Sequence, residues 1–188
     1  MIDENKYAET RTDVVLPALE QCCEEGWFDP SAAERSAGIE PLSGIMDTGG
    51  RSGQLHYLCY DSAKFDAIRE QGATATFRGA IVISHGFTEF AEKYDELVWY
   101  FLLAGYSVCV LEHRGHGKSA RDVDNRCMVW IDDWQRYVAD LAGFAETIGQ
   151  QYAAGMPLNL FCHSMGGGIG AAVLGRHPPL CGQAVLPA

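Results

Sequence analysis

The most informative segment of the chain is Asn159-Leu160-Phe161-Cys162-His163-Ser164-Met165-Gly166-Gly167-Gly168. A short apolar strand breaks there at one small polar residue, Ser164, and the chain restarts as a glycine-rich helix. A strand-to-helix turn this tight needs small flanking residues, and it lifts the serine hydroxyl to where a base and a substrate carbonyl can reach it. The pattern therefore predicts a nucleophile elbow with Ser164 as the nucleophile.

Short apolar runs and helical stripes alternate on the amino-terminal side of this segment. Buried strands are expected at residues 80–83, 106–111 and 158–162, and a further strand begins near 183–186. The expected helices cover residues 94–105, 130–148 and 165–176. Strands that alternate with helices predict an α/β fold, with a mostly parallel sheet and helices on both of its faces.

The first fifty residues differ from the rest. Apolar side chains at Val15, Leu19 and Cys22 or Cys23 recur at helical spacing and lead to Trp27-Phe28, which predicts one amphipathic helix. We expect residues 1–50 to form a helical extension packed on the core, and residues 51–188 to form the main domain. Within that domain, residues 55–60 are typical of a strand, paired with residues 44–47 across a glycine-rich turn.

The composition fits one globular domain. The chain has 188 residues, of which 47% are hydrophobic, so it can bury a sizeable core. A net charge of −11 disfavours nucleic acid as a partner, because phosphate binding needs clustered Lys and Arg. The 14 Lys and Arg form no basic run, so peripheral membrane contact would have to rest on an apolar patch.

The cysteines and the amino-terminal residues indicate a compartment. Seven cysteines are an odd number, and Cys109 and Cys162 lie inside apolar strands, which favours reduced core thiols. The chain shows neither the pattern of a signal peptide nor an apolar run of ~20 residues that could span a membrane. We therefore expect a cytoplasmic protein.

A second segment, Ser84-His85-Gly86-Phe87-Thr88-Glu89, directly follows the strand at 80–83. Acyl transfer places negative charge on the substrate oxygen, and a pair of fixed backbone N–H groups stabilises that charge. One donor is expected from the residue after the nucleophile, Met165, and the other from this segment, at Phe87. A His-Gly pair by itself would favour an ordinary strand-to-helix turn.

Three further patterns resemble cofactor or metal sites, but each lacks a residue that such a site requires or lies at the wrong place in the chain. The end of Glu112-His113-Arg114-Gly115-His116-Gly117-Lys118-Ser119 mimics a phosphate-binding loop, but Glu112 stands where a glycine is required. His113 and His116 lack the further ligands that a metal site needs. The glycines after Ser164 follow the third strand rather than the first, with no acidic residue about 20 positions on to bind a ribose, so a dinucleotide site is not expected. No cofactor or metal is predicted. His163 is interpreted as a residue that packs in the core or supports the site residues rather than as a base, because its side chain should leave the strand on the side opposite Ser164.

Taken together, residues 80–188 resemble the monoacylglycerol lipase and bacterial lysophospholipase group of α/β-hydrolases. The resemblance rests on His85-Gly86-Phe87-Thr88-Glu89, on His113-Arg114-Gly115-His116-Gly117-Lys118-Ser119 and on His163-Ser164-Met165-Gly166-Gly167, in this order. Cys162 departs from the glycine that usually leads the elbow. The resemblance implies a serine-dependent carboxylic ester hydrolase that acts on a small lipid ester and releases a fatty acid.

The resemblance also implies a catalytic Asp and His after the elbow, together with a cap over the active site. Residues 165–188 contain no Asp or Glu and one His, His177. We therefore expect the amino-terminal part of such an enzyme, inactive by itself and prone to self-association through an exposed strand edge. A small-ester or amide hydrolase of the same fold, and a non-catalytic fragment, remain alternatives.

Overall fold

The computed structural model describes residues 2, 4–39, 53–69, 75–125 and 127–187. Their centre is a six-stranded sheet with the strand order β1-β2-β4-β3-β5-β6. The strands are β1 (Cys23–Phe28), β2 (Leu55–Tyr60), β3 (Gly79–Ser84), β4 (Tyr106–Leu111), β5 (Leu158–Cys162) and β6 (Gln183–Val185). The helices are α1 (Tyr7–Thr10), α2 (Leu16–Cys22), α3 (Ser31–Ser36), α4 (Ser62–Ile68), α5 (Asp95–Leu103), α6 (Gln135–Phe144), α7 (Gln150–Ala153) and α8 (Met165–Arg176). Four short 3₁₀ or π segments accompany them: η1 (Glu4–Lys6), η2 (Arg11–Val15), η3 (Ala91–Tyr94) and η4 (Ala145–Gly149).

Four adjacent strands, β4, β3, β5 and β6, run parallel, whereas β1 and β2 are antiparallel to their neighbours. The mostly parallel sheet predicted from the sequence is therefore confirmed. The parallel strands are apolar on both faces because helices cover both faces. In β3, Ala80 and Val82 pack into one core and Ile81 and Ile83 into the other.

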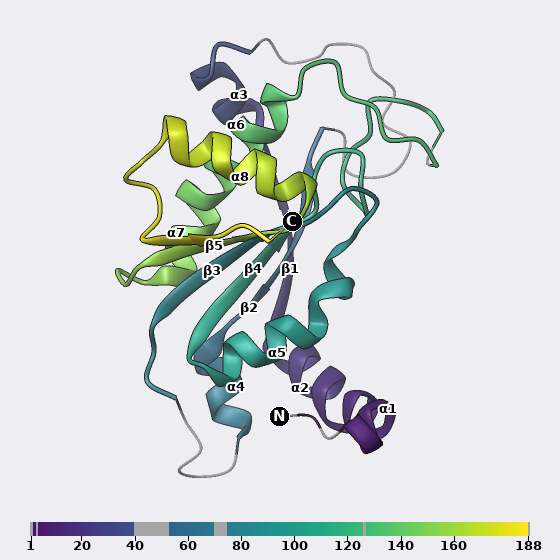
Figure 1. Cartoon of the computed structure of the whole chain (residues 1–188), viewed down its shortest axis with the longest axis vertical. Coiled ribbons are helices and arrows are strands. Elements are labelled where there is room, and N and C mark those ends of the chain that lie inside the picture. Colours follow the sequence, from purple (N-terminus) through teal and green to yellow (C-terminus); the bar gives the residue numbers. More distant parts are fainter. Residues whose placement is uncertain (1, 3, 40–52, 70–74, 126, 188) are drawn as a thin grey trace.

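The two cores lie on opposite faces of the sheet (Figure 1). Helices α3, α6, α7 and α8 cover one face, where Leu141, Phe144 and Val173 pack. Helices α2, α4 and α5 cover the other, where Phe65 and Leu102 pack. The crossovers from β3 to β4 through α5, and from β4 to β5 through α6, bring the carboxyl ends of all three strands to one edge.

The amino-terminal residues correct one prediction. The predicted amphipathic helix ends at Cys22, and residues 23–28 form β1, which pairs with β2 along its whole length. Helical spacing of apolar residues stops at this point, and an extended segment can instead satisfy the free backbone groups at the edge of β2. The pairing predicted between residues 44–47 and β2 lies outside the described residues.

The long helix predicted from Trp130 begins at Gln135, so Trp130 and Trp134 precede it. It continues through η4 and α7 to Ala153.

None of the helices within the described ranges is long and apolar enough to cross a bilayer.

Candidate active site

Ser164 occupies the turn between β5 and α8. Its backbone has φ 54° and ψ −116°, a conformation that residues with a Cβ rarely adopt. The serine is exposed, its N–H donates to the carbonyl oxygen of Pro187 at 3.1 Å, and among the described residues its hydroxyl has no hydrogen-bond partner. The strained turn therefore presents a free hydroxyl at the carboxyl edge of the sheet.

Close packing of α8 on the sheet explains two of the glycines that follow. A Cβ on Gly166 would lie 2.1 Å from the carbonyl oxygen of Ser84, and a Cβ on Gly170 would lie 2.5 Å from the sulfur of Cys162. Cys162, the residue that replaces the usual glycine, is fully buried, and burial raises the pKa of its thiol to about 12. The thiol is therefore a packing group under α8 and not a second nucleophile.

The segment after β3 emerges beside Ser164, because Ser84 at the end of β3 pairs with Cys162 at the end of β5. In this segment the carbonyl oxygen of Gly86 faces Nδ1 of His85 at 2.7 Å and accepts from the N–H of Glu89 at 3.3 Å. A trans peptide unit is planar, so the N–H of Phe87 points away from these two donors.

Met165 is the first residue of α8, so its N–H has no partner within the helix and lies at the positive end of the helix dipole. The two backbone donors predicted from the sequence, on Phe87 and Met165, thus lie just after neighbouring parallel strands at the same edge of the sheet.

Three buried histidines lie beneath these loops. The ring of His85 lies edge-on to those of His113 and His116, with centroids 4.7 Å and 5.1 Å away. His85 Nε2 accepts from the N–H of His113 at 2.9 Å while its Nδ1 donates to Gly86, so the ring is neutral. Burial lowers the pKa of His85 to about 4 and that of His113 well below its usual value. These rings therefore support the loops and are not placed as bases; His113 Nε2 contacts the Ser84 hydroxyl at 2.8 Å.

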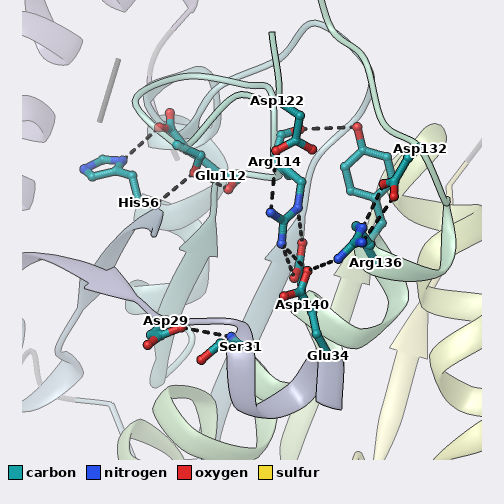
Figure 2. Close-up of polar contacts among 12 residues, drawn as sticks. Asp29, Ser31, Glu34, His56, Glu112, Arg114, Asp122, Asp132, Arg136 and Asp140 are labelled. Carbon is teal, nitrogen blue, oxygen red and sulfur yellow. Dashed lines mark hydrogen bonds and ion pairs between the residues drawn. The ribbon is translucent and has the colours of Figure 1, made fainter. Parts of the chain in front are cut away.

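A buried carboxylate that sequence reasoning missed organises the loop after β4. Glu112 accepts from the backbone N–H groups of Ala91 at 3.0 Å and Lys118 at 2.7 Å. Its carboxylate also contacts Nδ1 of His56 at 2.8 Å (Figure 2). Burial by itself would raise its pKa, but these hydrogen bonds outweigh burial and lower it to about 2. A Cβ on Gly117 would lie 2.1 Å from the same carboxyl group. The carboxylate of Glu112 thus fills the space inside the loop that mimics a phosphate-binding loop.

A second missed cluster ties the same loop to α6 and α3. Arg114 donates to Asp140 at 3.1 Å and to Glu34 at 2.9 Å, and Arg136 also donates to Glu34, at 2.7 Å (Figure 2). All four side chains are buried. Burial raises the pKa of Asp140 to about 6, against the opposing effect of the Arg114 guanidinium. Sequence pattern could not pair Glu34 with Arg114, because 80 positions separate them.

No general base for Ser164 is placed by the described residues. His163 Nδ1 lies 3.2 Å from the carboxylate of Glu89. His177 follows the last residue of α8 and lies 3.7 Å from Glu146. A rise of ~1.5 Å per residue puts it roughly 20 Å from Ser164 along the helix. The described part of the chain therefore brings a candidate nucleophile and two candidate donors to one edge of the sheet, and no acid or base for Ser164 is among its placed groups.

Comparisons with known proteins identify the family and the fold. Residues 75–188 match the profile of a hydrolase family described as serine aminopeptidase, S33. Lysophospholipase L2 of Escherichia coli strain K12 is 34% identical over 111 residues, which is 57% of this chain and 32% of that protein. Monoglyceride lipase of Mus musculus is 34% identical over 115 residues, 60% of this chain and 35% of that protein.

A crystal structure of a thermostable carboxyl esterase from Bacillus coagulans superposes with a TM-score of 0.59 at 22% identity, over 87% of this chain and 43% of that chain. That likeness concerns the fold, which is the α/β-hydrolase fold in part. The chain spans about a third of the length of the curated relatives it matches.

Proposed function

Since the chain belongs to the hydrolase family described as serine aminopeptidase, S33, we propose that it supplies the nucleophile and the oxyanion hole of a serine-dependent carboxylic ester hydrolase. The observation that carries the proposal is the conformation of Ser164. A non-glycine residue with φ 54° at a strand-to-helix turn costs of order 1–3 kcal/mol, and such strain is typical of functional sites.

The proposed chemistry uses three groups of this chain. Ser164 Oγ attacks the ester carbonyl carbon, and the N–H groups of Phe87 and Met165 hold the oxygen that becomes negative. Collapse of the tetrahedral intermediate breaks the ester C–O bond, so the alcohol leaves with the proton that Ser164 gave up and the acyl group stays on Ser164 Oγ. Water then attacks the acyl carbonyl carbon, the bond to Ser164 Oγ breaks, and the carboxylic acid leaves while one proton of the water returns to the serine.

We propose a monoacyl lipid ester as the substrate, a lysophospholipid or a monoacylglycerol. The support is that two relatives at 34% identity carry the names lysophospholipase and monoglyceride lipase. The family description names an aminopeptidase, which keeps an amide substrate as the second candidate.

Substitution of the nucleophile tests the proposal. In the full-length natural protein, Ser164→Ala should lower kcat/KM for ester hydrolysis by at least about 10³-fold, because the acyl intermediate can no longer form. The matched control is Ser36→Ala, which removes an exposed hydroxyl bonded to its own helix carbonyl at 2.9 Å and should leave kcat/KM within twofold. Ester hydrolysis by Ser164→Ala within tenfold of the parent would refute Ser164 as the nucleophile.

Mass spectrometry separates the two substrate classes. The full-length natural protein, incubated with lysophosphatidylcholine, with a monoacylglycerol and with an aminoacyl peptide, should release free fatty acid from the lipid esters. Peptide cleavage without release of fatty acid would replace the ester hydrolase with an amidase.

The polypeptide of residues 1–188 should react slowly by itself. Without a placed base the Ser164 hydroxyl stays protonated, so we expect a fluorophosphonate probe to label it no faster than about 1% of the rate of a typical serine hydrolase. Strand β6 lies at the edge of the sheet, and exposed Val185 at its end and Leu186 after it should also favour oligomers in size-exclusion chromatography. A monomer that labels rapidly at Ser164 would show that these residues contain a working base.

A further inference from the structure

Glu89 lies where the loop after β3 meets the residue before the nucleophile. Its Oε2 accepts from the N–H of Gly86 at 2.7 Å and from the hydroxyl of Tyr94 at 2.5 Å, and lies 3.2 Å from Nδ1 of His163. Its Oε1 accepts from Lys93 Nζ at 2.6 Å. One carboxylate oxygen is thus shared by the loop after β3, by η3 and by the residue that precedes Ser164.

Glu89 is held as an anion by these partners. Its side chain is 8% exposed, and burial by itself would raise its pKa. Hydrogen bonds from Lys93, Tyr94, Gly86 and His163 outweigh burial and lower the pKa to about 2. Charged acceptors bind N–H donors roughly twice as strongly as neutral ones, so the carboxylate can hold a backbone segment in one conformation.

The segment held in this way contains the proposed oxyanion donor. The backbone N–H of Glu89 closes the turn onto the carbonyl of Gly86, while its carboxylate binds the N–H of Gly86. Both bonds act on the backbone that carries the Gly86–Phe87 peptide unit, whose N–H is the proposed donor. A Cβ on Gly86 would lie 2.9 Å from Glu89 Oε2 and 3.0 Å from His163 Nδ1, so both side chains pack directly against this peptide.

From this geometry we infer that Glu89 is a positioning residue, which aims the N–H of Phe87 at the oxyanion and fixes the loop after β3 against the turn that carries Ser164. The inference rests on the proposed function. Glu89 acts on the reaction through Phe87 and His163 and does not contact the substrate.

Glu89→Gln in the full-length natural protein tests the inference. Glutamine keeps the size of the side chain but replaces one accepting oxygen with an amide group that can only donate. We expect kcat for a monoacyl ester to fall by about 10- to 100-fold with KM changed by less than threefold, because loss of an oxyanion donor weakens transition-state binding and removal of one such donor outright costs 10²–10³. The inhibition constant of an alkyl boronic acid, which forms a tetrahedral anion on Ser164, should rise by a similar factor.

The matched control is Glu92→Gln, the same substitution at an exposed position of η3, which should keep kcat within twofold. Active sites are counted by fluorophosphonate titration, so a loss that merely reflects unfolded protein is removed from kcat. Should Glu89→Gln not fold, Tyr94→Phe removes one donor to the same oxygen and should lower kcat by about threefold at unchanged KM.

The outcomes separate this inference from the proposed function. Suppose that Ser164→Ala abolishes activity while Glu89→Gln leaves it unchanged, or Tyr94→Phe does where that variant is used. That result overturns the role of Glu89 alone. A fall in kcat that disappears on normalisation to titrated sites, or that comes entirely through KM, also overturns it. Activity retained in Ser164→Ala overturns the proposed function, and this inference with it.

Discussion

A single residue position, Gly166, shows how tightly the nucleophile turn is built. Ser164 has a positive φ, and two residues later the backbone of α8 passes so close to β3 that a Cβ on Gly166 would lie 2.1 Å from the carbonyl oxygen of Ser84. That oxygen also accepts the N–H of His163 at 3.0 Å. Movement of the Ser84 carbonyl would therefore disturb the residue next to the nucleophile.

Alanine substitutions at two glycines of α8 test this close approach of the helix to β3. Gly166→Ala should lower the free energy of unfolding by at least about 2 kcal/mol, since overpacking against backbone costs roughly 1–3 kcal/mol or more. The control is Gly168→Ala, which is exposed with nothing within 4 Å of its Cβ position. That change should be neutral or stabilise by up to about 1 kcal/mol, because alanine is the better helix former. Equal stabilities of the two variants in urea denaturation would contradict the close approach.

Among the elements, the loop after β4 is held by buried charges rather than by regular structure. Arg114 joins it to Asp140 of α6 and to Glu34 of α3. Glu112, the first residue of the loop, joins it to the backbone of Lys118 six residues later and to that of Ala91 in η3. Buried ion pairs add little net stability when complete, but removal of one partner leaves an uncompensated charge.

Arg114→Ala should therefore lower the free energy of unfolding by about 3–5 kcal/mol, because it leaves buried carboxylates without their cation. The matched control is Lys64→Ala, which breaks the ion pair with Glu24 where both side chains are about half exposed. That change should cost far less than Arg114→Ala, because water already solvates both charges of this pair. Urea denaturation measures both, and a loss below about 1 kcal/mol for Arg114→Ala would show that water solvates this cluster.

For the molecule as a whole, the free energy of unfolding depends on pH through two buried groups, His85 and Asp140, whose effects have opposite signs. His85 is neutral in the fold with a pKa lowered by burial to about 4, whereas in the unfolded chain it titrates near 6.5. Unfolding at intermediate pH therefore binds a proton at His85, and this contribution to stability is lost as pH falls from 6.5 to 4. Burial raises the pKa of Asp140 to about 6, so Asp140 releases a proton on unfolding and acts in the opposite direction between 3.8 and 6.

A variant isolates the histidine contribution. The free energy of unfolding of the parent minus that of His85→Gln should fall by about 3 kcal/mol between pH 6.5 and pH 4, the linkage value for a shift of this size in a fully buried group. Above pH 7 the difference should be constant. A pH-independent difference over the whole range would mean that His85 is exposed to solvent in the folded protein.

The sequence by itself determined the local elements around the site. Continuous apolar runs predicted β3, β4 and β5 because strands buried on both faces carry no polar alternation. Small residues around Ser164 predicted the turn, because few backbones other than a tight strand-to-helix junction require them. These signals are local, so residues within a few positions of one another carry them.

Only the tertiary structure decided which distant groups meet. Residues 23–28 form a strand because the edge of β2 offers free backbone partners, which a helical pattern in the preceding residues cannot reveal. Glu89 contacts His163 across 74 positions, and Arg114 contacts Glu34 across 80. Such contacts depend on the strand order β4-β3-β5 and on the crossovers that bring the carboxyl ends of these strands together. An isolated acidic residue in a sequence does not say which of several backbone donors it will bind, because burial and geometry select the partner only once the sheet has formed.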